Sequence, residues 1–245
     1  MFKRAMDIIL STAGLLVFLP LLFIVALLVF LQDFHNPLYI ATRVGKRRKP
    51  FKMVKLRSMI VDAEKSGVDS TSSDDKRITW IGRFIRKIKL DEITQLWNVL
   101  IGDMSLVGPR PNVERDVAIY TEEEFQLLNV HPGITDFSSI VFADESSILA
   151  GSKNPDLDYN QLIRPWKNRL AIFYIKNRSI LLDIKLIFLT IVSIISRRKA
   201  LNGINKILVK FSADEKLIDV ALRKFALVPY PPPGSDKIVT SRTRV

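Results

Sequence analysis

The sequence predicts a mainly helical α+β protein held in a membrane by its N-terminus, and three observations lead to this fold class. Residues 8–31 form an apolar run without a charged side chain. Further along, apolar residues recur at the i, i+3, i+4, i+7 spacing of amphipathic helices. Residues 38–57 alternate as two short strands would. At 245 residues, the chain can bury a sizeable core, as one domain or two.

The composition limits the available chemistry. There are 37 Lys and Arg against 25 Asp and Glu, a formal net charge of +12, which favours an anionic partner such as nucleic acid, an acidic membrane surface or a phosphorylated substrate. Cysteine is absent and the two histidines are His35 and His131, which excludes disulfides, cysteine nucleophiles and multi-histidine metal centres. Chemistry must rest on carboxylates, hydroxyls, lysines and arginines, with a hard cation such as Mg²⁺ where one is needed.

The apolar run at residues 8–31 predicts a membrane helix. As one helix it is roughly 36 Å long, enough to cross a hydrocarbon core of about 30 Å. If it breaks at Pro20, each half is only roughly 18 Å long and the chain must return to the face it entered. The basic residues that flank the run are Lys3, Arg4, Arg43, Lys46, Arg47, Arg48, Lys49, Lys52, Lys55 and Arg57. They suit both topologies, and the residues alone favour spanning slightly.

Residues 38–57 are expected to form two strands around a basic turn that contains glycine and proline. In the second strand, the period-2 rule places Phe51, Met53, Lys55 and Arg57 on one face. That face either presents cations to phosphates or rests on anionic lipid headgroups, and both interpretations stay open.

Two helices are expected after a polar loop at residues 66–75. The first covers residues 76–88, and the second begins at Asp91. Their apolar stripes are Ile78, Ile81, Phe84, Ile85 and Ile88, followed by Ile93, Leu96, Trp97 and Leu100. Next, Pro109 and Pro111 push the residues before them, Gly108 and Arg110, to extended backbone.

The C-terminal half is less sharply defined. Residues 131–142 are expected to turn into a strand. Residues 179–196 are apolar but contain Asp183 and Lys185, so a second spanning helix, an interfacial helix and a core helix are all left open. Residues 229–245 are rich in proline and predict a disordered tail.

The adjacent carboxylates Asp91 and Glu92 have two interpretations. Acidic side chains at the start of a helix accept backbone N–H groups and suit the positive end of the dipole, which favours a capping role. The cations that could converge on an anion beside them are Lys55, Arg57, Arg83, Arg86 and Arg110. In such company a carboxylate stays ionised, ready to ligate Mg²⁺ or attack phosphorus. The same stabilisation lowers its nucleophilicity, which a metal on the phosphoryl group would offset.

Four blocks of sequence carry a resemblance to a known family. They are "KRAMDIILS" with the later "LP", "RVGKRRKPFKMVKLRSM" at 43–59, "IGRFIRKIKLDEITQLWNVLIGDMSLVGPRP" at 81–111 and "HPGIT" at 131–135. In this order the chain resembles bacterial sugar transferases of the small monotopic phosphoglycosyl transferase type, over about residues 2–195. The third block is long and specific. Two positions depart from the common pattern, Ala41 in place of Gln and Asp136–Phe137 in place of Gly-Trp, and they leave the sugar undefined.

The resemblance implies both an activity and a topology. The enzyme would move a sugar-1-phosphate from a nucleotide diphosphate sugar, usually a UDP-sugar, to polyprenyl phosphate. Asp91 would be the nucleophile and Glu92 the second acid of the dyad, with Mg²⁺ at both carboxylates and Arg86 and Arg110 on phosphates. The N-terminal helix would be re-entrant and broken at Pro20, which replaces the preference for spanning, with both ends on the cytoplasmic face of the bacterial inner membrane.

These expectations divide the chain into four segments. Residues 1–35 would form the re-entrant helix, residues 36–200 the catalytic domain with membrane-associated helices, residues 201–228 an added helix and residues 229–245 the tail. Nucleic acid is not an expected partner, and a homodimer is compatible with the sequence. Two alternatives remain: direct transfer with Asp91 as base or metal ligand, and a basic membrane adaptor without chemistry.

Overall fold

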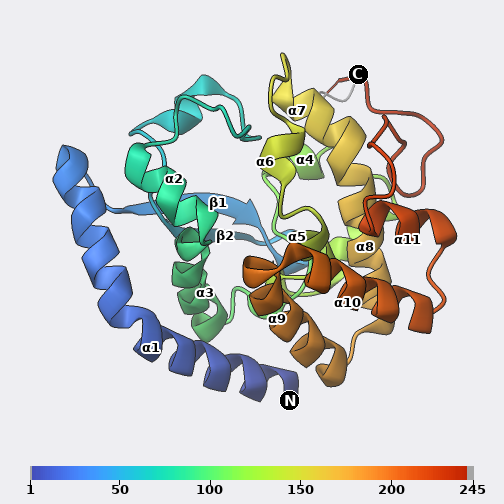
Figure 1. Ribbon diagram of the computed structural model, residues 1–245, viewed down its shortest axis with the longest axis horizontal. Helices are drawn as coiled ribbons and strands as arrows, with labels where there is room; N and C mark the ends of the chain where they lie inside the picture. Colours follow the sequence, from blue (N-terminus) through green and yellow to red (C-terminus); the bar gives the residue numbers. More distant parts are fainter. Residues whose placement is uncertain (1, 242–245) are drawn as a thin grey trace.

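The computed structural model describes residues 2–241, and this part of the chain is mainly helical. The N-terminal helix α1 (Phe2–Asp33) runs along one side of the rest of the protein, the body, which consists of two small sheets and many short helices (Figure 1). The first sheet pairs β1 (Leu38–Val44) with β2 (Pro50–Leu56), and the second pairs β3 (Ser105–Val107) with β4 (Gly133–Thr135). The α+β, mainly helical prediction is confirmed.

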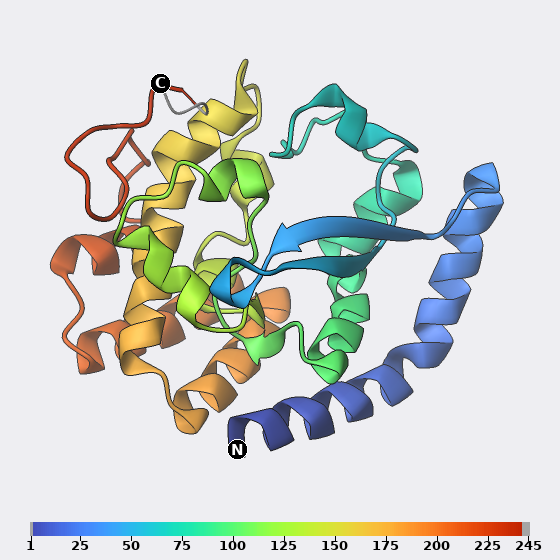
Figure 2. The ribbon, with the colours of Figure 1, turned by 180° about the vertical axis from the view of Figure 1, so that it is seen from behind.

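Helix α1 is continuous from Phe2 to Asp33 with Pro20 inside it, and both views show it bent, with its first half below the body and its second half along the side (Figures 1 and 2). Only 17% of the most apolar 18-residue stretch of α1 is buried inside the protein. Within the described residues, α1 is the one helix long and apolar enough to cross a membrane. Side chains such as Val17 and Phe23 are more than 70% exposed. This exposed apolar surface fits membrane association.

The inner side of α1 packs on the body. Leu22, Val25 and Val29 are buried in a cluster with residues of β2, α2 and the following turn. Further back, Gly14 lies against α3, because a Cβ on Gly14 would come 2.9 Å from the Leu96 side chain. Both halves of the bent helix α1 therefore pack against the rest of the protein.

The predicted hairpin at residues 38–57 is confirmed. Strands β1 and β2 pair antiparallel, with Leu38 opposite Leu56 and Val44 opposite Pro50. A 3₁₀ turn, Lys46–Arg48, joins them. Phe51 and Met53 face the core, as the period-2 rule requires.

The two helices after the hairpin start at different residues from those predicted. Helix α2 (Trp80–Lys87) begins late because the Thr79 side chain caps it, accepting from Gly82 N–H. Ile78 is buried but pairs with Met59 in an isolated bridge, and Phe84, expected on the buried stripe, is 57% exposed. The next segment is a 3₁₀ helix, Leu90–Gln95, that continues as α3 (Leu96–Ile101).

Strands β3 and β4 pair in parallel, and the backbone at Gly108, just after β3, closely approaches Gly133 of β4. A Cβ on Gly133 would come 2.1 Å from Gly108 N, so neither position leaves room for a side chain. The predicted strand at residues 131–142 is confirmed only as β4, since the chain then enters α5 (Phe137–Val141), which Asp136 caps by accepting from Ser139 N–H. The other short helices are α4 (Glu114–Val117), α6 (Glu145–Ile148), α7 (Pro155–Asp158) and the 3₁₀ helices Ala63–Ser66 and Glu124–Asn129.

The C-terminal part is helical and packs into the main core. A π-helical turn, Tyr159–Ile163, leads into α8 (Arg164–Asn177), followed by α9 (Ile180–Ile195), α10 (Arg197–Lys210) and α11 (Glu215–Ala221). Helix α9 is roughly 24 Å long, too short to span, and it buries Leu182 and Leu186 while Phe188 is 63% exposed. Its Asp183 pairs with Lys3 of α1 at 2.5 Å.

Two predicted boundaries need correction. Helix α10 crosses residue 200 and buries Ala200, Ile204 and Leu208 in the main core, so residues 201–228 are no separate unit. The segment 229–241, expected to be disordered, lies against α8, with the Tyr230 ring stacked on Trp166 at a centroid distance of 4.3 Å. Residues 242–245 of the predicted tail lie outside the described residues.

Candidate functional site

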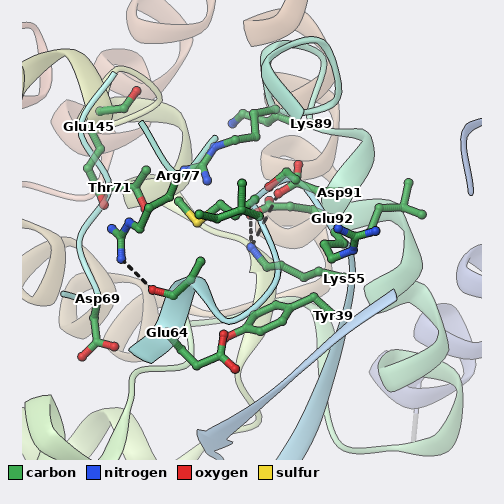
Figure 3. A pocket seen from close by; sticks show the side chains of 18 of the residues that line it. Tyr39, Lys55, Glu64, Asp69, Thr71, Arg77, Lys89, Asp91, Glu92 and Glu145 are labelled. Atoms are coloured by element: carbon green, nitrogen blue, oxygen red, sulfur yellow. Dashed lines mark hydrogen bonds and ion pairs between the residues drawn. The ribbon is translucent and has the colours of Figure 1, made fainter. Parts of the chain in front are cut away.

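An open cavity of about 600 Å³ lies between the hairpin, the loop that follows it and the α5–α6 region. Asp91 and Glu92 line one side together with Lys55, while Glu64 and Asp69 of the loop lie on the opposite side (Figure 3). The cavity also takes in Arg86, Lys89, Arg110 and Lys167. Four of these five cations come from residues 55–110, around the hairpin and the dyad, and the fifth, Lys167, comes from the distant helix α8 (Arg164–Asn177).

The dyad sits in the first turn of the Leu90–Gln95 3₁₀ helix. The chain enters this helix through Lys89, whose φ of 56° is left-handed, and no side chain caps the helix. The capping hydrogen bonds of the first interpretation are therefore not formed, although both acids lie in the first turn as that interpretation requires. Both carboxylates instead point towards cations that come from other elements.

Glu92 is the more firmly held carboxylate. It accepts a two-pronged interaction from the Arg110 guanidinium, with Nη1 3.2 Å from Oε2 and Nη2 on Oε1. Lys55 Nζ lies 3.3 Å from the same Oε1. Asp91 is less engaged, because its carboxylate accepts no hydrogen bond from a described residue and Lys55 Nζ is 3.8 Å from Oδ2. Asp91 is thus the carboxylate left available for chemistry.

The environment drives the two carboxyl pKa values in opposite directions. Burial raises the pKa of Asp91, opposed by the charge of Lys55 and assisted by that of Glu92. Burial acts in the same direction on Glu92, but the charges of Arg110 and Lys55 outweigh it and hold the Glu92 pKa well below its usual range. Glu92 is then the fixed anion and Asp91 the more basic oxygen. The sequence predicted that nearby cations lower the nucleophilicity of Asp91. In the structure, burial raises the Asp91 pKa and outweighs the lowering by the Lys55 charge.

Arg110 is positioned by the segment around it. Its Nη1 donates to Ile134 O at 2.6 Å, and Gly133 N–H donates to Pro109 O at 2.9 Å. With Pro109 and Pro111 restricting the backbone, the guanidinium is fixed at the edge of the cavity. Burial would lower the pKa of Arg110, but the Glu92 charge outweighs it and raises the pKa.

The other predicted phosphate ligands differ in their placement. Lys55 and Arg86 line the cavity. Arg57 also lines the cavity, but its guanidinium binds the Asp33 carboxylate at 2.5 and 2.6 Å and so ties the end of α1 to the residue that follows β2. Arg83 is exposed on α2 and does not line the cavity. Four of the five predicted cations therefore line the cavity, and three of them, Lys55, Arg86 and Arg110, are not already engaged by Asp33.

Sequence reasoning missed two lysines that line the cavity. Lys89 stands two residues before Asp91, and its Nζ donates to Ser139 O of α5 at 3.3 Å. Burial lowers the pKa of Lys89. Lys167 of α8 is paired with Glu145. The position of Lys89 next to the dyad could have been noticed in the sequence. No local sequence pattern indicates that α8 brings Lys167 to the cavity.

The donor set is compatible with a magnesium ion that is shared with substrate phosphates. Mg²⁺ is commonly bound by one or two carboxylates, with waters and phosphates completing its shell. Asp91 offers a carboxylate without hydrogen bonds, and Glu92 lies next to it. Within residues 2–241 there is no cluster of three acidic or histidine side chains that could hold a metal by itself. The residues fit a metal completed by the substrate.

Comparison with known proteins decides the family. The model of the family described as "Bacterial sugar transferase" matches residues 1–197. The chain belongs to this family. The resemblance stated from the sequence is confirmed, and with it the enzyme class, so this chain is a sugar transferase. The match ends at the start of α10, and the cavity and the dyad lie inside it.

Several relatives share long segments with this sugar transferase. A Bacillus subtilis protein, named provisionally as an undecaprenyl-phosphate N-acetylgalactosaminyl 1-phosphate transferase, is 49% identical over 133 residues, which cover 54% of this chain and 70% of the relative. The Rhizobium leguminosarum bv. phaseoli "Exopolysaccharide production protein PSS" is 38% identical over 80% of this chain and 96% of its own.

Other relatives are longer than this sugar transferase. The Escherichia coli "UDP-glucose:undecaprenyl-phosphate glucose-1-phosphate transferase" is 36% identical over 78% of this chain, and the match spans 39% of the relative. The chain therefore corresponds to a part of that protein and to nearly all of the Rhizobium one.

Proposed function

We propose that this sugar transferase moves a sugar-1-phosphate from a UDP-sugar to polyprenyl phosphate and thereby starts the assembly of a glycan on a lipid. The observation that carries the proposal is the pairing of a cation-lined cavity holding Asp91 with an exposed apolar helix. A soluble diphosphate and a lipid phosphate must meet in such a place. The names of the relatives, which pair undecaprenyl phosphate with glucose or N-acetylgalactosamine phosphates, support the same reaction.

In the first step, an Asp91 carboxylate oxygen attacks the phosphorus that bears the sugar. The new bond joins this oxygen to phosphorus, and the bond from phosphorus to the bridging oxygen breaks, so that UMP leaves with the electron pair. The product is an aspartyl phosphosugar. A buried carboxylate with a raised pKa is a better nucleophile than a solvated one, which favours Asp91 over Glu92.

In the second step, a phosphate oxygen of the polyprenyl phosphate attacks the same phosphorus. The bond to the Asp91 oxygen breaks, the carboxylate is regenerated, and the sugar diphospholipid leaves. The two displacements use one nucleophile and one cavity, so the donor and acceptor phosphates occupy the same cations in turn.

The surrounding side chains stabilise the charge that develops on phosphate oxygens. Lys55 is close to both carboxylates, and Arg86, Lys89 and Arg110 line the same cavity. Glu92 holds Lys55 and Arg110 in place before substrate arrives, which removes the cost of reorganisation during the reaction. Mg²⁺, held by Asp91 and Glu92 together with substrate phosphate, would add Lewis-acid polarisation of the phosphoryl group.

For the membrane topology, we propose that α1 enters and leaves the cytoplasmic face of the inner membrane as a bent, monotopic helix. Its bend, the basic residues at both ends and its inner contacts with α3 support this arrangement. The chain has no cysteine, so single cysteines at Phe2 and Arg47 can be labelled in intact cells without background. Labelling of both from the cytoplasmic side is expected, and labelling from opposite sides would contradict it.

The activity is tested by supplying the purified full chain with Mg²⁺, undecaprenyl phosphate and single UDP-sugars. UDP-glucose, UDP-galactose and UDP-N-acetylgalactosamine form the first panel. Release of UMP that depends on the lipid, together with a new lipid-linked sugar phosphate, is the expected result. Binding of acidic vesicles with no UMP release from any UDP-sugar would favour the adaptor alternative.

A further inference from the structure

The segment that follows the family match, residues 198–241, packs on the outside of the cavity wall. Helix α10 contacts α5 and α9, and α11 contacts α8; Figure 1 shows α10 and α11 beside the α5–α8 part of the body. Since the family match ends at residue 197, the contacts of this segment are additions to the shared domain.

The first attachment is made by Arg223, just after α11. Its Nη2 donates to Asp144 Oδ1 at 2.7 Å, and its guanidinium carbon lies 4.9 Å from the centre of the Phe142 ring. Asp144 also pairs with Arg197 at 2.9 Å. The Arg223 side chain is only 16% exposed, so this ion pair is better shielded from solvent than most surface pairs.

The residues that Arg223 holds form part of the cavity wall. Phe142 lines the cavity directly, and Asp144 is followed by two further lining residues, Glu145 and Ser146. Glu145 pairs with Lys167, which brings a cation to the cavity. The α5–α6 turn is therefore a joint between the C-terminal segment and the site.

The same turn also anchors the loop on the other side of the cavity. Ser73 N–H donates to Ser146 O at 2.8 Å. This contact fixes one end of the loop at residues 58–73, which contributes Glu64 and Asp69 to the lining. A shift of the α5–α6 turn would thus move both the wall and the loop.

A second attachment holds the α8 side of the wall. Tyr230 stacks on Trp166, and its N–H donates to Gln161 O at 3.0 Å. Arg169 places its guanidinium 4.8 Å from the Tyr230 ring and donates to Pro231 O at 2.8 Å. Lys167 lies between these anchored residues and faces the cavity. The segment thus grips the wall at two places.

We propose that the C-terminal segment braces the donor cavity and that Arg223 is its positioning residue, acting through Asp144 and Phe142 on the wall and the docked loop. The role in donor binding rests on the proposed function. Without Arg223, Asp144 keeps its pair with Arg197 but the turn loses its tie to the end of α11, and the wall and the loop at residues 58–73 open more often. The cost is expected in the binding of the UDP-sugar, because Asp91 and its cations belong to other elements.

The test compares three variants of the full chain: Arg223→Ala, Arg223→Lys and Lys224→Ala. Lys224 is the matched control, because it is adjacent in sequence but pairs only with Asp219 inside the same segment. With the most active UDP-sugar of the panel, Arg223→Ala should raise KM about fivefold and change kcat less than twofold. Arg223→Lys should recover part of the loss, and Lys224→Ala should match the parent.

A second readout does not depend on catalysis. Amide hydrogen exchange should rise at residues 58–73 and 142–146 in Arg223→Ala, with no change in the β1–β2 hairpin as internal reference. A parent chain that is inactive on every UDP-sugar would contradict the proposed function and leave this exchange test of the brace in force. Unchanged exchange at both segments, or a uniform rise over the whole chain, would overturn the brace.

Discussion

Two clusters of charged side chains in this protein are built from the same residue types but differ in how completely they are paired. In the core, Arg164 and Glu124 form an ion pair with both side chains 0% exposed. Glu124 also accepts from Asn168 at 2.6 Å and from Thr121 N–H at 2.9 Å. In the cavity, Asp91 accepts no hydrogen bond from a described residue and has a single cation within 4 Å.

The degree of pairing distinguishes a cluster built for stability from one built for chemistry. A buried ion pair repays its desolvation only when further hydrogen bonds satisfy both partners, and the core cluster meets this condition at Glu124. The cavity cluster leaves Asp91 with one cation at 3.8 Å and no hydrogen bond from a described residue, and the Lys89 ammonium bonds a backbone carbonyl; both side chains line open space. Such incomplete pairing is what an anionic substrate and a metal would complete.

The largest expected effect is on Asp91. Asp91→Asn removes the nucleophilic oxygen while keeping size and polarity, and turnover should fall by at least about 10³-fold. The unfolding temperature should stay close to that of the parent, because Asp91 holds no structural hydrogen bond with its side chain. UMP release and thermal unfolding, measured on the same preparation, check both statements. Substantial turnover in this variant would remove Asp91 from the mechanism.

The opposite pattern is expected in the core cluster. Glu124→Gln leaves the buried Arg164 charge without its partner and should destabilise the fold by about 3–5 kcal/mol. Turnover per folded molecule should not change, since neither residue lines the cavity. Denaturant unfolding in detergent gives the first quantity and activity normalised to folded protein gives the second. As control, Asp219→Asn at the surface should cost less than about 1 kcal/mol.

A smaller effect is expected when the geometry of a cation changes but its charge remains. Arg110→Lys cannot reproduce the two-pronged interaction with Glu92, and kcat/KM should fall about 10- to 100-fold. Arg198→Lys on the exposed surface of α10 is the control and should have no effect. Equal kinetics for Arg110→Lys and the parent would mean that the two-pronged interaction between Arg110 and Glu92 has no role in the reaction.

The smallest expected effect concerns pH. Asp91 must be ionised to attack, and its pKa is raised by burial and lowered by Lys55, so activity should fall as the pH drops through the Asp91 pKa. Removing the charge in Lys55→Met takes away the lowering contribution, and the acid limb of the kcat/KM profile should move to higher pH. A shift to lower pH in this variant would contradict the assigned environment.

The parts predicted from the sequence are those with a local pattern. The β1–β2 hairpin follows from period-2 alternation around a basic turn, and the dyad and Arg110 were singled out by adjacent acids and flanking prolines. Arg83 and Arg86 are both basic residues of α2, and the sequence alone does not distinguish them. Arg83 lies on the exposed side of the helix, whereas Arg86 lines the cavity. Here the helical register was predicted, but the orientation relative to the cavity was not.

The parts missed depend on contacts between distant segments. Lys167 reaches the cavity only because α8 packs beside α5, and Tyr230 orders the C-terminal segment through a stack on Trp166. The composition of a proline-rich segment indicates disorder because composition carries no information about contacts with distant residues, such as that of Tyr230 with Trp166, 64 residues away in the chain. The raised pKa of Asp91 could not be predicted from the sequence for the same reason, since its burial is a property of the assembled cavity.

Capture of phosphorus by Asp91 can be detected by peptide mass spectrometry of the full-length protein. The protein is incubated with Mg²⁺ and the active UDP-sugar in the absence of polyprenyl phosphate, then digested. The expected result is a mass increase equal to one sugar phosphate on the peptide that contains Asp91, lost when polyprenyl phosphate is added and absent in Asp91→Asn. An unmodified peptide under conditions where UMP release and lipid transfer proceed at the normal rate would contradict it and favour direct transfer between the two substrates.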